Sequence, residues 1–143
     1  MKNLRGAHFE EKRALPAKNK RYAIGTSVIL KARDNLRVIW VALTNTDIGT
    51  NKTHADIEDL QRAIRSALTT ARNKGNGDVL SVPLMGGGLS RTGLSSSFLL
   101  NLLIGLIIDE SKKESITETI NIVLTRRVIN ELNLLEIKKS WEG

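Results

Sequence analysis

The chain has 143 residues, of which 41% are hydrophobic and 26% charged, so we expect one globular domain. It has no cysteine and two histidines, which excludes disulfides and a catalytic thiol and disfavours a zinc site. The formal net charge is +7, and the first 21 residues hold seven Lys or Arg against two Glu. We therefore expect residues 1–20 to form a basic N-terminal tail or linker and residues 21–143 to form the folded domain.

Two strands and a polar loop are expected first. The run YAIGTSVIL from Tyr22 predicts a strand with a bulge or a close backbone approach at Gly25. The segment ARDNL predicts a turn, and the nearly continuous apolar run Leu36 to Leu43 predicts a strand covered on both faces. The segment TNTDIGTNKTH, rich in Asn, Thr, Asp and Gly, predicts a loop over residues 44–54.

An amphipathic helix is expected after this loop. Thr53 and Asp56 have the spacing of a capping box, with Asp in place of the usual Glu or Gln. Residues 73–77 are expected to end the helix, with Gly75 or Gly77 in the left-handed conformation. The run DVLSVPLM then predicts a strand in which Pro83 indicates a sheet edge or a strand end.

The last third predicts a buried helix, a strand and a final helix. The apolar helix is expected from Ser95 to about Asp109, and its longest apolar stretch is shorter than the roughly 20 residues that cross a bilayer. The run ETINIVLT predicts the strand, and Arg126 to Lys139 predicts the final helix. Its expected inner side carries Val128, Ile129, Leu132 and Leu135. No signal peptide is expected, and we expect the domain in the cytoplasm.

The resulting order, β-β-α-β-α-β-α, is typical of an α/β layered sheet. Such sheets bind ligands beyond the carboxyl ends of their strands, in the loops that lead into helices. Two loops satisfy this description, Thr44 to His54 and Gly86 to Ser97.

The glycine-rich loop suits a phosphate. Three consecutive glycines let a ligand approach backbone N–H groups ahead of a helix N-terminus, and Arg91 adds a cation among serine and threonine hydroxyls. Two common nucleotide motifs are excluded. Leu94 stands where a P-loop needs its lysine, and Arg91 stands where the dinucleotide fingerprint needs its third glycine.

The pieces YAIGT, VALTNTD and VPLMGGGLSRTGLS, with the helices between and after them, resemble the macro domain of membrane-linked Thoeris antiphage-defence effectors over roughly residues 20–126. The resemblance implies a three-layer α/β/α fold with a mixed sheet. It also implies an NAD-derived ligand of the ADP-ribose type, such as histidine-linked ADP-ribose, sensed without turnover. A TIR-domain enzyme would be the functional partner that makes this signal, and no cofactor is expected.

The resemblance also implies the site residues. The loop after the third expected strand would line the diphosphate, and the loop after the second would lie near the distal ribose and its substituent. The residues are Pro83, Leu84, Gly86, Gly87, Gly88, Leu89, Ser90, Arg91, Thr92 and Gly93 for the first loop, and Thr44, Asn45, Thr46 and Asp47 for the second.

Members of the family that the chain resembles usually carry a half-domain ahead of the IGT strand, and this half-domain contacts adenine and ribose. A transmembrane segment usually precedes the half-domain. Neither pattern is present in residues 1–20. We expect the chain to be a fragment, the product of a split gene, or a compact variant whose adenosine pocket a second chain or a homo-oligomer completes.

Two other functions stay open. A macro-type ADP-ribosyl hydrolase would need a general base, for which Asp47 and His54 are the candidates. A nucleic-acid or protein interaction domain would use the basic tail, but the chain has no base-stacking aromatic cluster, and we expect no nucleic-acid partner.

Overall fold

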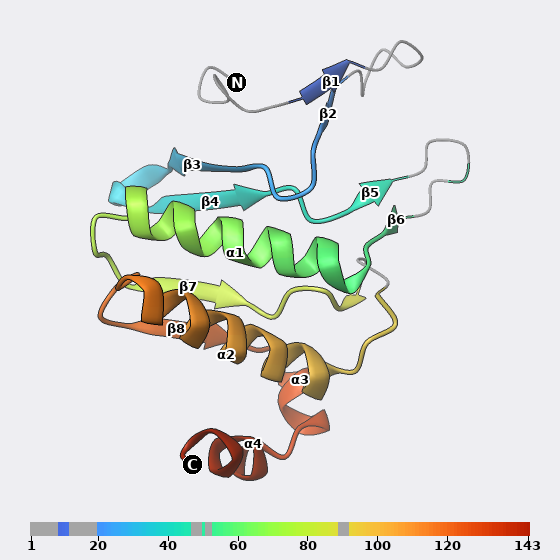
Figure 1. Ribbon diagram of the computed structural model, residues 1–143, viewed down its shortest axis with the longest axis vertical. Helices are drawn as coiled ribbons and strands as arrows, with labels where there is room; N and C mark the ends of the chain where they lie inside the picture. Colours follow the sequence, from blue (N-terminus) through green and yellow to red (C-terminus); the bar gives the residue numbers. More distant parts are fainter. Residues whose placement is uncertain (1–8, 12–19, 47–49, 51–52, 89–91) are drawn as a thin grey trace.

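The computed structural model describes residues 9–11, 20–46, 50, 53–88 and 92–143. Strands and helices alternate through most of this chain, which confirms the α/β class (Figure 1). In order, the elements are β1 (Phe9–Glu11), β2 (Lys20–Tyr22), β3 (Ser27–Lys31), a 3-10 turn (Arg33–Asn35), β4 (Arg37–Val41), β5 (Asn45–Thr46), β6 (Thr53–His54), α1 (Ile57–Lys74), β7 (Leu80–Pro83), α2 (Ser96–Lys113), β8 (Ile120–Val123), α3 (Arg126–Glu131) and α4 (Leu134–Trp141).

The described strands form four two-stranded ladders. The pairs β1–β2, β3–β4 and β5–β6 are antiparallel, and β7–β8 is parallel. Within the described residues no ladder joins β4 to β7, although both strands pack near α1 (Figure 1). The β1 strand lies inside the segment expected to be a basic tail, and the domain boundary at residue 20 stays a prediction.

One hydrophobic core joins α1 and α2 to the strands. Leu60, Ile64 and Leu68 of α1 and Leu103 of α2 are almost completely buried. Alternate residues of the strands pack against this core, namely Ile39, Leu80, Val82, Ile120 and Ile122. The intervening Trp40, Ser81 and Asn121 are exposed.

The prediction that residues 36–43 are covered on both faces was wrong. Ile39 packs against the core, but the neighbouring Trp40 is 65% exposed. A continuous apolar run does not distinguish a strand covered twice from one whose outer face is apolar and open.

The predicted first strand is divided at Gly25, which separates β2 from β3. Gly25 has a φ of +86°, and its N–H donates to the carbonyl of Ala42 at 2.8 Å. A Cβ on Gly25 would lie 3.0 Å from Cγ of Arg62. The predicted close approach at Gly25 is therefore confirmed.

Helix α1 begins later than the capping-box spacing predicted. Its N-cap is Asp56, whose side chain accepts from the N–H of Asp59 at 2.8 Å. Thr53 instead pairs with Thr46 in the β5–β6 ladder, so the predicted loop over 44–54 contains a short hairpin. At the other end Gly77 has a φ of +73°, as predicted, whereas Gly75 is right-handed.

The expected final helix is two helices. Asn133 caps the second of them by accepting from the N–H of Glu136 at 3.2 Å, which ends α3 before it. Val128 and Leu132 are half-buried as expected, but Ile129 and Leu135 are exposed. Helix α4 contacts α2 through Trp141, whose Nε1 donates to Oδ1 of Asn101 at 2.9 Å.

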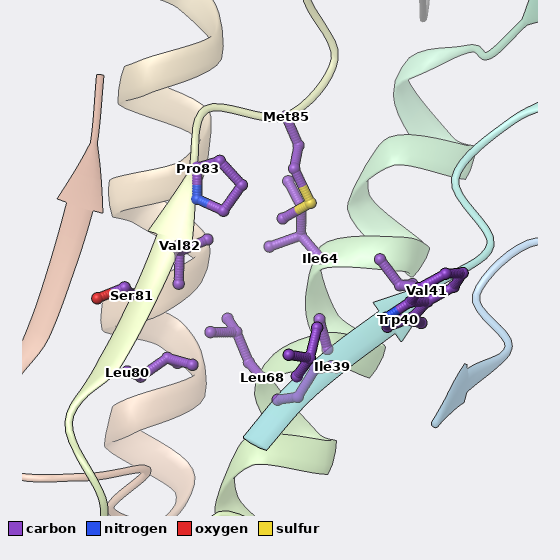
Figure 2. A pocket seen from close by; sticks show the side chains of 12 residues that line it. Ile39, Trp40, Val41, Ile64, Leu68, Leu80, Ser81, Val82, Pro83 and Met85 are labelled. Carbon is purple, nitrogen blue, oxygen red and sulfur yellow. The ribbon is translucent and has the colours of Figure 1, made fainter. Parts of the chain in front are cut away.

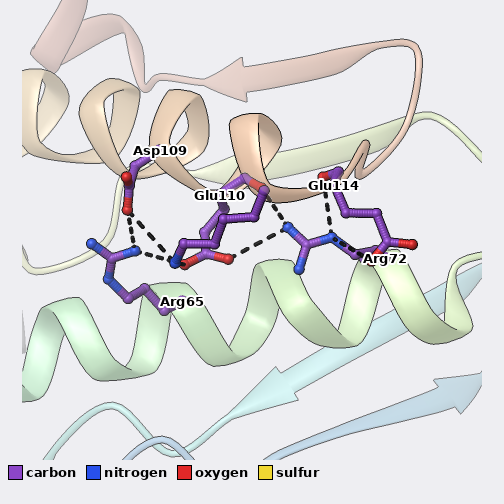
Figure 3. A network of polar contacts seen from close by, with 6 residues as sticks. Arg65, Arg72, Asp109, Glu110 and Glu114 are labelled. Atoms are coloured by element: carbon purple, nitrogen blue, oxygen red, sulfur yellow. Dashed lines mark hydrogen bonds and ion pairs between the residues drawn. The ribbon is translucent and has the colours of Figure 1, made fainter.

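A buried carboxylate ties α1 to α2 (Figure 3). Glu110 of α2 is 4% exposed and accepts from Arg65 at 2.6 Å and from Arg72 at 3.4 Å, both on α1. Lys113 donates to it at 2.6 Å. Hydrogen bonds from Lys113, and then from Arg65 and Arg72, lower the pKa of Glu110 to about 2 although burial opposes the shift.

None of the helices in the described ranges combines the length and the apolar character that a membrane span requires.

Candidate functional site

The site is at the edge of the fold where strands end and helices begin. Figure 1 shows β4 and β7 pointing toward the same side, the side at which α1 and α2 start. The segment from Pro83 to Ser95 joins β7 to α2 at this edge. Helix N-termini and strand carboxyl ends together favour an anionic ligand.

Gly86 anchors the glycine loop in the core. It is buried, with a φ of +94°, and a Cβ at this position would lie 2.8 Å from Cδ2 of both Leu60 and Leu99. These leucines belong to α1 and α2, so the loop backbone lies between the first turns of the two helices. Packing and backbone conformation therefore both require glycine at residue 86.

Two later glycines of the loop, Gly88 and Gly93, face open space. Gly88 has a φ of +57° and Gly93 a φ of +71°, and a Cβ on either would meet no atom of the described residues within 4 Å. Gly87 and Gly88 are exposed. These positions leave the backbone accessible, which is the property that a phosphate-binding loop needs.

Thr92 closes the loop. Its Oγ1 donates to the carbonyl of Gly86 at 2.6 Å and accepts from the N–H of Leu94 at 3.3 Å. The structure thus brings together Gly86 and Thr92, two predicted site residues. The Thr92 hydroxyl is engaged in holding the loop, a structural function that the sequence did not indicate.

Pro83 and Leu84 direct the chain into the loop. Pro83 is the exposed last residue of β7, which agrees with its predicted place at a strand end. The N–H of Leu84 donates to the carbonyl of Val123 at 3.3 Å, and its side chain packs against the core. Leu84 therefore fixes the start of the loop to the end of β8 and to the core.

The second predicted loop follows β4 at the same edge. Thr44 and Asn45 are half-buried and Thr46 is exposed. Asn45 pairs with His54 across the β5–β6 ladder, which brings the backbones of those residues together.

Four predicted site residues, Asp47, Leu89, Ser90 and Arg91, lie outside the residues that the structure describes. Their assignment to the site stays a prediction.

An acidic residue near the loop was missed by the sequence analysis. Glu131 of α3 accepts from Oγ of Ser96 at 3.1 Å, at the first turn of α2, and from Arg127 at 2.9 Å. The hydrogen bond from Arg127, followed by that from Ser96, lowers the pKa of Glu131. The four-residue spacing of Arg127 and Glu131 indicates their pairing, but only the tertiary structure brings Glu131 to Ser96.

Ser95 caps α2 by accepting from the N–H of Phe98 at 3.2 Å, so α2 begins where the apolar helix was predicted to begin. The loop therefore ends in a regular helix N-terminus, with the cap side chain already engaged.

A family profile described as the macro domain of the Thoeris protein ThsA matches residues 2–125. No curated protein matches the chain. Because the profile covers most of the chain, the chain belongs to this macro-domain family, and the resemblance inferred from the sequence is confirmed. The match also includes the segment expected to be a basic tail, and it ends just before α3.

Proposed function

We propose that this member of the ThsA macro-domain family binds an NAD-derived nucleotide of the ADP-ribose type, such as histidine-linked ADP-ribose, as a signal in antiphage defence and does not hydrolyse it. The observation that carries the proposal is the loop between β7 and α2, closed by the hydrogen bond of Thr92 to Gly86 and held between α1 and α2. Family membership supports the class of ligand.

The diphosphate is assigned to the loop from Gly86 to Gly93. The exposed Gly88 offers its backbone to a ligand, since a Cβ at this position would meet no atom of the described residues within 4 Å. Arg91 would supply the positive charge and bidentate donors, and Ser90 a hydroxyl. The hydrogen bond from Thr92 to the carbonyl of Gly86 holds the two ends of the loop together.

The distal ribose and its substituent are assigned to residues 44–47. This segment follows β4 at the edge where the glycine loop follows β7, which is where α/β folds bind their ligands. In this proposal Asp47 contacts the substituent.

The proposed partners follow from the ligand. A TIR-domain enzyme would make the signal, and a second chain or another copy of this one would complete the adenosine side of the pocket. The domain would act in the cytoplasm without a cofactor and without nucleic acid.

Calorimetry with ADP-ribose and with histidine-linked ADP-ribose tests the proposal. We expect saturable binding of at least one ligand, weakened about tenfold or more by Arg91→Ala, because a lost charge-assisted contact has roughly that effect. Arg33→Ala is the matched control, since Arg33 is an exposed arginine in the turn before β4. Absence of binding, or equal binding by the Arg91 variant, would contradict the proposal.

The hydrolase alternative is tested in the same mixtures. Mass spectrometry should recover the ligand unchanged after prolonged incubation. Release of free ADP-ribose from a conjugate, abolished by Asp47→Ala, would instead establish the macro-type hydrolase.

A further inference from the structure

Strands β4 and β7 each have one edge without a ladder in the described part of the chain. The only described strand that pairs with β4 is β3, and the only one that pairs with β7 is β8. Figure 2 shows β4 and β7 on opposite sides of a cavity, with Ile64 and Leu68 of α1 between them. The two unpaired edges thus face each other across this space.

The hydrogen bonds of the existing ladders fix which backbone groups point into the space from β4. Ala42 donates to Thr26, and Ala32 donates to Leu36, so the hydrogen-bonded positions of the β3–β4 ladder are even-numbered on β4. Ile39 and Val41 therefore direct their N–H and C=O groups away from β3 and toward β7.

The same reasoning applies to β7. The N–H of Leu80 donates to Thr119, and that of Leu84 donates to Val123, so even-numbered residues of β7 face β8. Ser81 therefore directs both its N–H and its C=O toward β4. Pro83, which has no N–H, offers only a carbonyl on this side.

The space has the length of both strands. One cavity of about 390 Å³ is lined by residues 38–41 of β4 and 80–83 of β7. A second of about 480 Å³ shares lining residues with the first and continues toward Arg37 and Asp78. Four consecutive residues of each strand line the first cavity, which is expected at a strand edge, because a strand face would contribute alternate residues.

The floor of this slot is apolar, and its rim carries large exposed apolar side chains. Ile64 and Leu68 of α1 form the floor. Three large apolar side chains that line the slot are exposed, Trp40 at 65%, Leu36 at 60% and Val79 at 62%. A charged pair lies at the amino ends of β4 and β7. Its members are Arg37 and Asp78, whose Nη1 and Oδ2 atoms are 3.8 Å apart. Large exposed apolar side chains gathered along one cavity favour an interaction site.

We propose that the slot between β4 and β7 binds one extended strand of another polypeptide chain, uncharged and apolar at alternate positions. Such a strand would hydrogen-bond to Ile39 and Val41 on one side and to Ser81 on the other, and its apolar side chains would cover Ile64 and Leu68. It would join the β3–β4 and β7–β8 ladders into one sheet, continuing two interfaces that already exist.

The directions of β4 and β7 allow one strand of another chain to pair with both of them. β4 and β7 point the same way in Figure 2, so an inserted strand is either parallel to both or antiparallel to both. The missing N–H of Pro83 limits pairing on β7 to its amino half. The centre of the inserted strand should therefore lie opposite Ser81.

Fluorescence titration of the full chain tests the proposal. With Trp141→Phe, Trp40 is the one remaining tryptophan and reports on the slot. The probe is a capped heptapeptide of alternating valine and threonine flanked by lysines, and its control has proline in place of the central valine. We expect a saturable blue shift of Trp40 emission with the first peptide and none with the second.

The matched variants are Ser81→Pro and Ser81→Ala. Both alter an exposed side chain, but only proline removes the N–H that faces the slot. We expect Ser81→Pro to bind the peptide about tenfold more weakly than Ser81→Ala, as the loss of one backbone hydrogen bond predicts. The two variants should unfold at similar urea concentrations, because the β7–β8 ladder does not use this N–H.

Several results would overturn the proposal. These are the absence of a saturable shift, equal binding of the proline peptide, and equal affinity of the two Ser81 variants. A dimer that Ser81→Pro dissociates would support the proposal and identify the other chain as a second copy. Cross-linking of residues 1–8 or 12–19 to Trp40 within one chain would overturn it, because the strand would then come from the same chain. The assay contains no nucleotide, so its failure is distinguishable from a failure of ADP-ribose binding.

Discussion

At the scale of single residues, neighbouring glycines of one loop are required for different reasons. Gly86 has no room for a methyl group between Leu60 and Leu99, whereas Gly88 faces open space. The sequence pattern of three glycines predicted ligand contact for all of them. For Gly86 the dominant requirement is packing, which a strand-loop-helix pattern cannot reveal because Leu60 belongs to a separate helix.

Gly86→Ala and Gly88→Ala should therefore have unequal effects on stability. We expect the first to lower the free energy of unfolding by about 2–4 kcal/mol, through overpacking and an unfavourable φ, and the second by about 1 kcal/mol, through φ alone. Urea unfolding followed by circular dichroism measures both values. Equal losses would show that the loop does not lie between the two helices as described.

At the scale of elements, local patterns predicted the types and order of the main elements but not all of their ends. The periodicity of α1 and the apolar run of α2 were sufficient to predict both helices. Asp56, not Thr53, caps α1 because Thr53 pairs with Thr46 across a hairpin. The break between α3 and α4 depends on the cap at Asn133, a residue that propensity alone tolerates inside a helix.

The contact between α1 and α2 should depend on pH through Glu110. Folding lowers the pKa of this carboxyl from 4.5 to about 2, so its contribution is complete above about pH 4.5 and is lost as the pH falls toward 2. We expect Glu110→Gln to reduce the free energy of unfolding by about 2–3 kcal/mol near neutral pH, because Arg65 and Arg72 lose their buried partner.

The difference between Glu110→Gln and the unmodified chain should shrink as the pH is lowered, which urea titrations at several pH values would measure. Glu114→Gln is the matched control, because the Glu114 side chain is exposed and its Oε2 lies 4.0 Å from Nε of Arg72. Its expected effect is about 0.5 kcal/mol or less. A pH-independent loss at Glu110 would contradict the assigned role of its charge.

At the scale of the whole molecule, helices rather than a continuous sheet unite the fold. The β3–β4 and β7–β8 ladders exchange no strand hydrogen bonds in the described residues, yet Ile39 and Ile122 belong to one core built on α1 and α2. The sequence predicted the layered class from the alternation of strands and helices. It could not predict the gap between β4 and β7, because strand neighbours are set by tertiary packing.

We expect this shared core to make unfolding cooperative. In the Trp141→Phe variant, the fluorescence of Trp40 on β4 and the far-ultraviolet circular dichroism of the helices should change at the same urea concentration. An earlier change of Trp40 fluorescence would show that β3–β4 is a separate and weaker unit. Ser140→Ala, a substitution on α4 away from β4, is a control in the same background.

The position of Gly86 also bears on how occupancy of the loop could be communicated. With Leu60 on one side and Leu99 on the other, the backbone at Gly86 is packed between two helices, and a methyl group there would have to displace both leucines. We expect a ligand that shifts the Gly86 backbone to shift the first turns of α1 and α2 as well, because closely packed groups move together. The contact that excludes a side chain at residue 86 would then connect the loop to both helices.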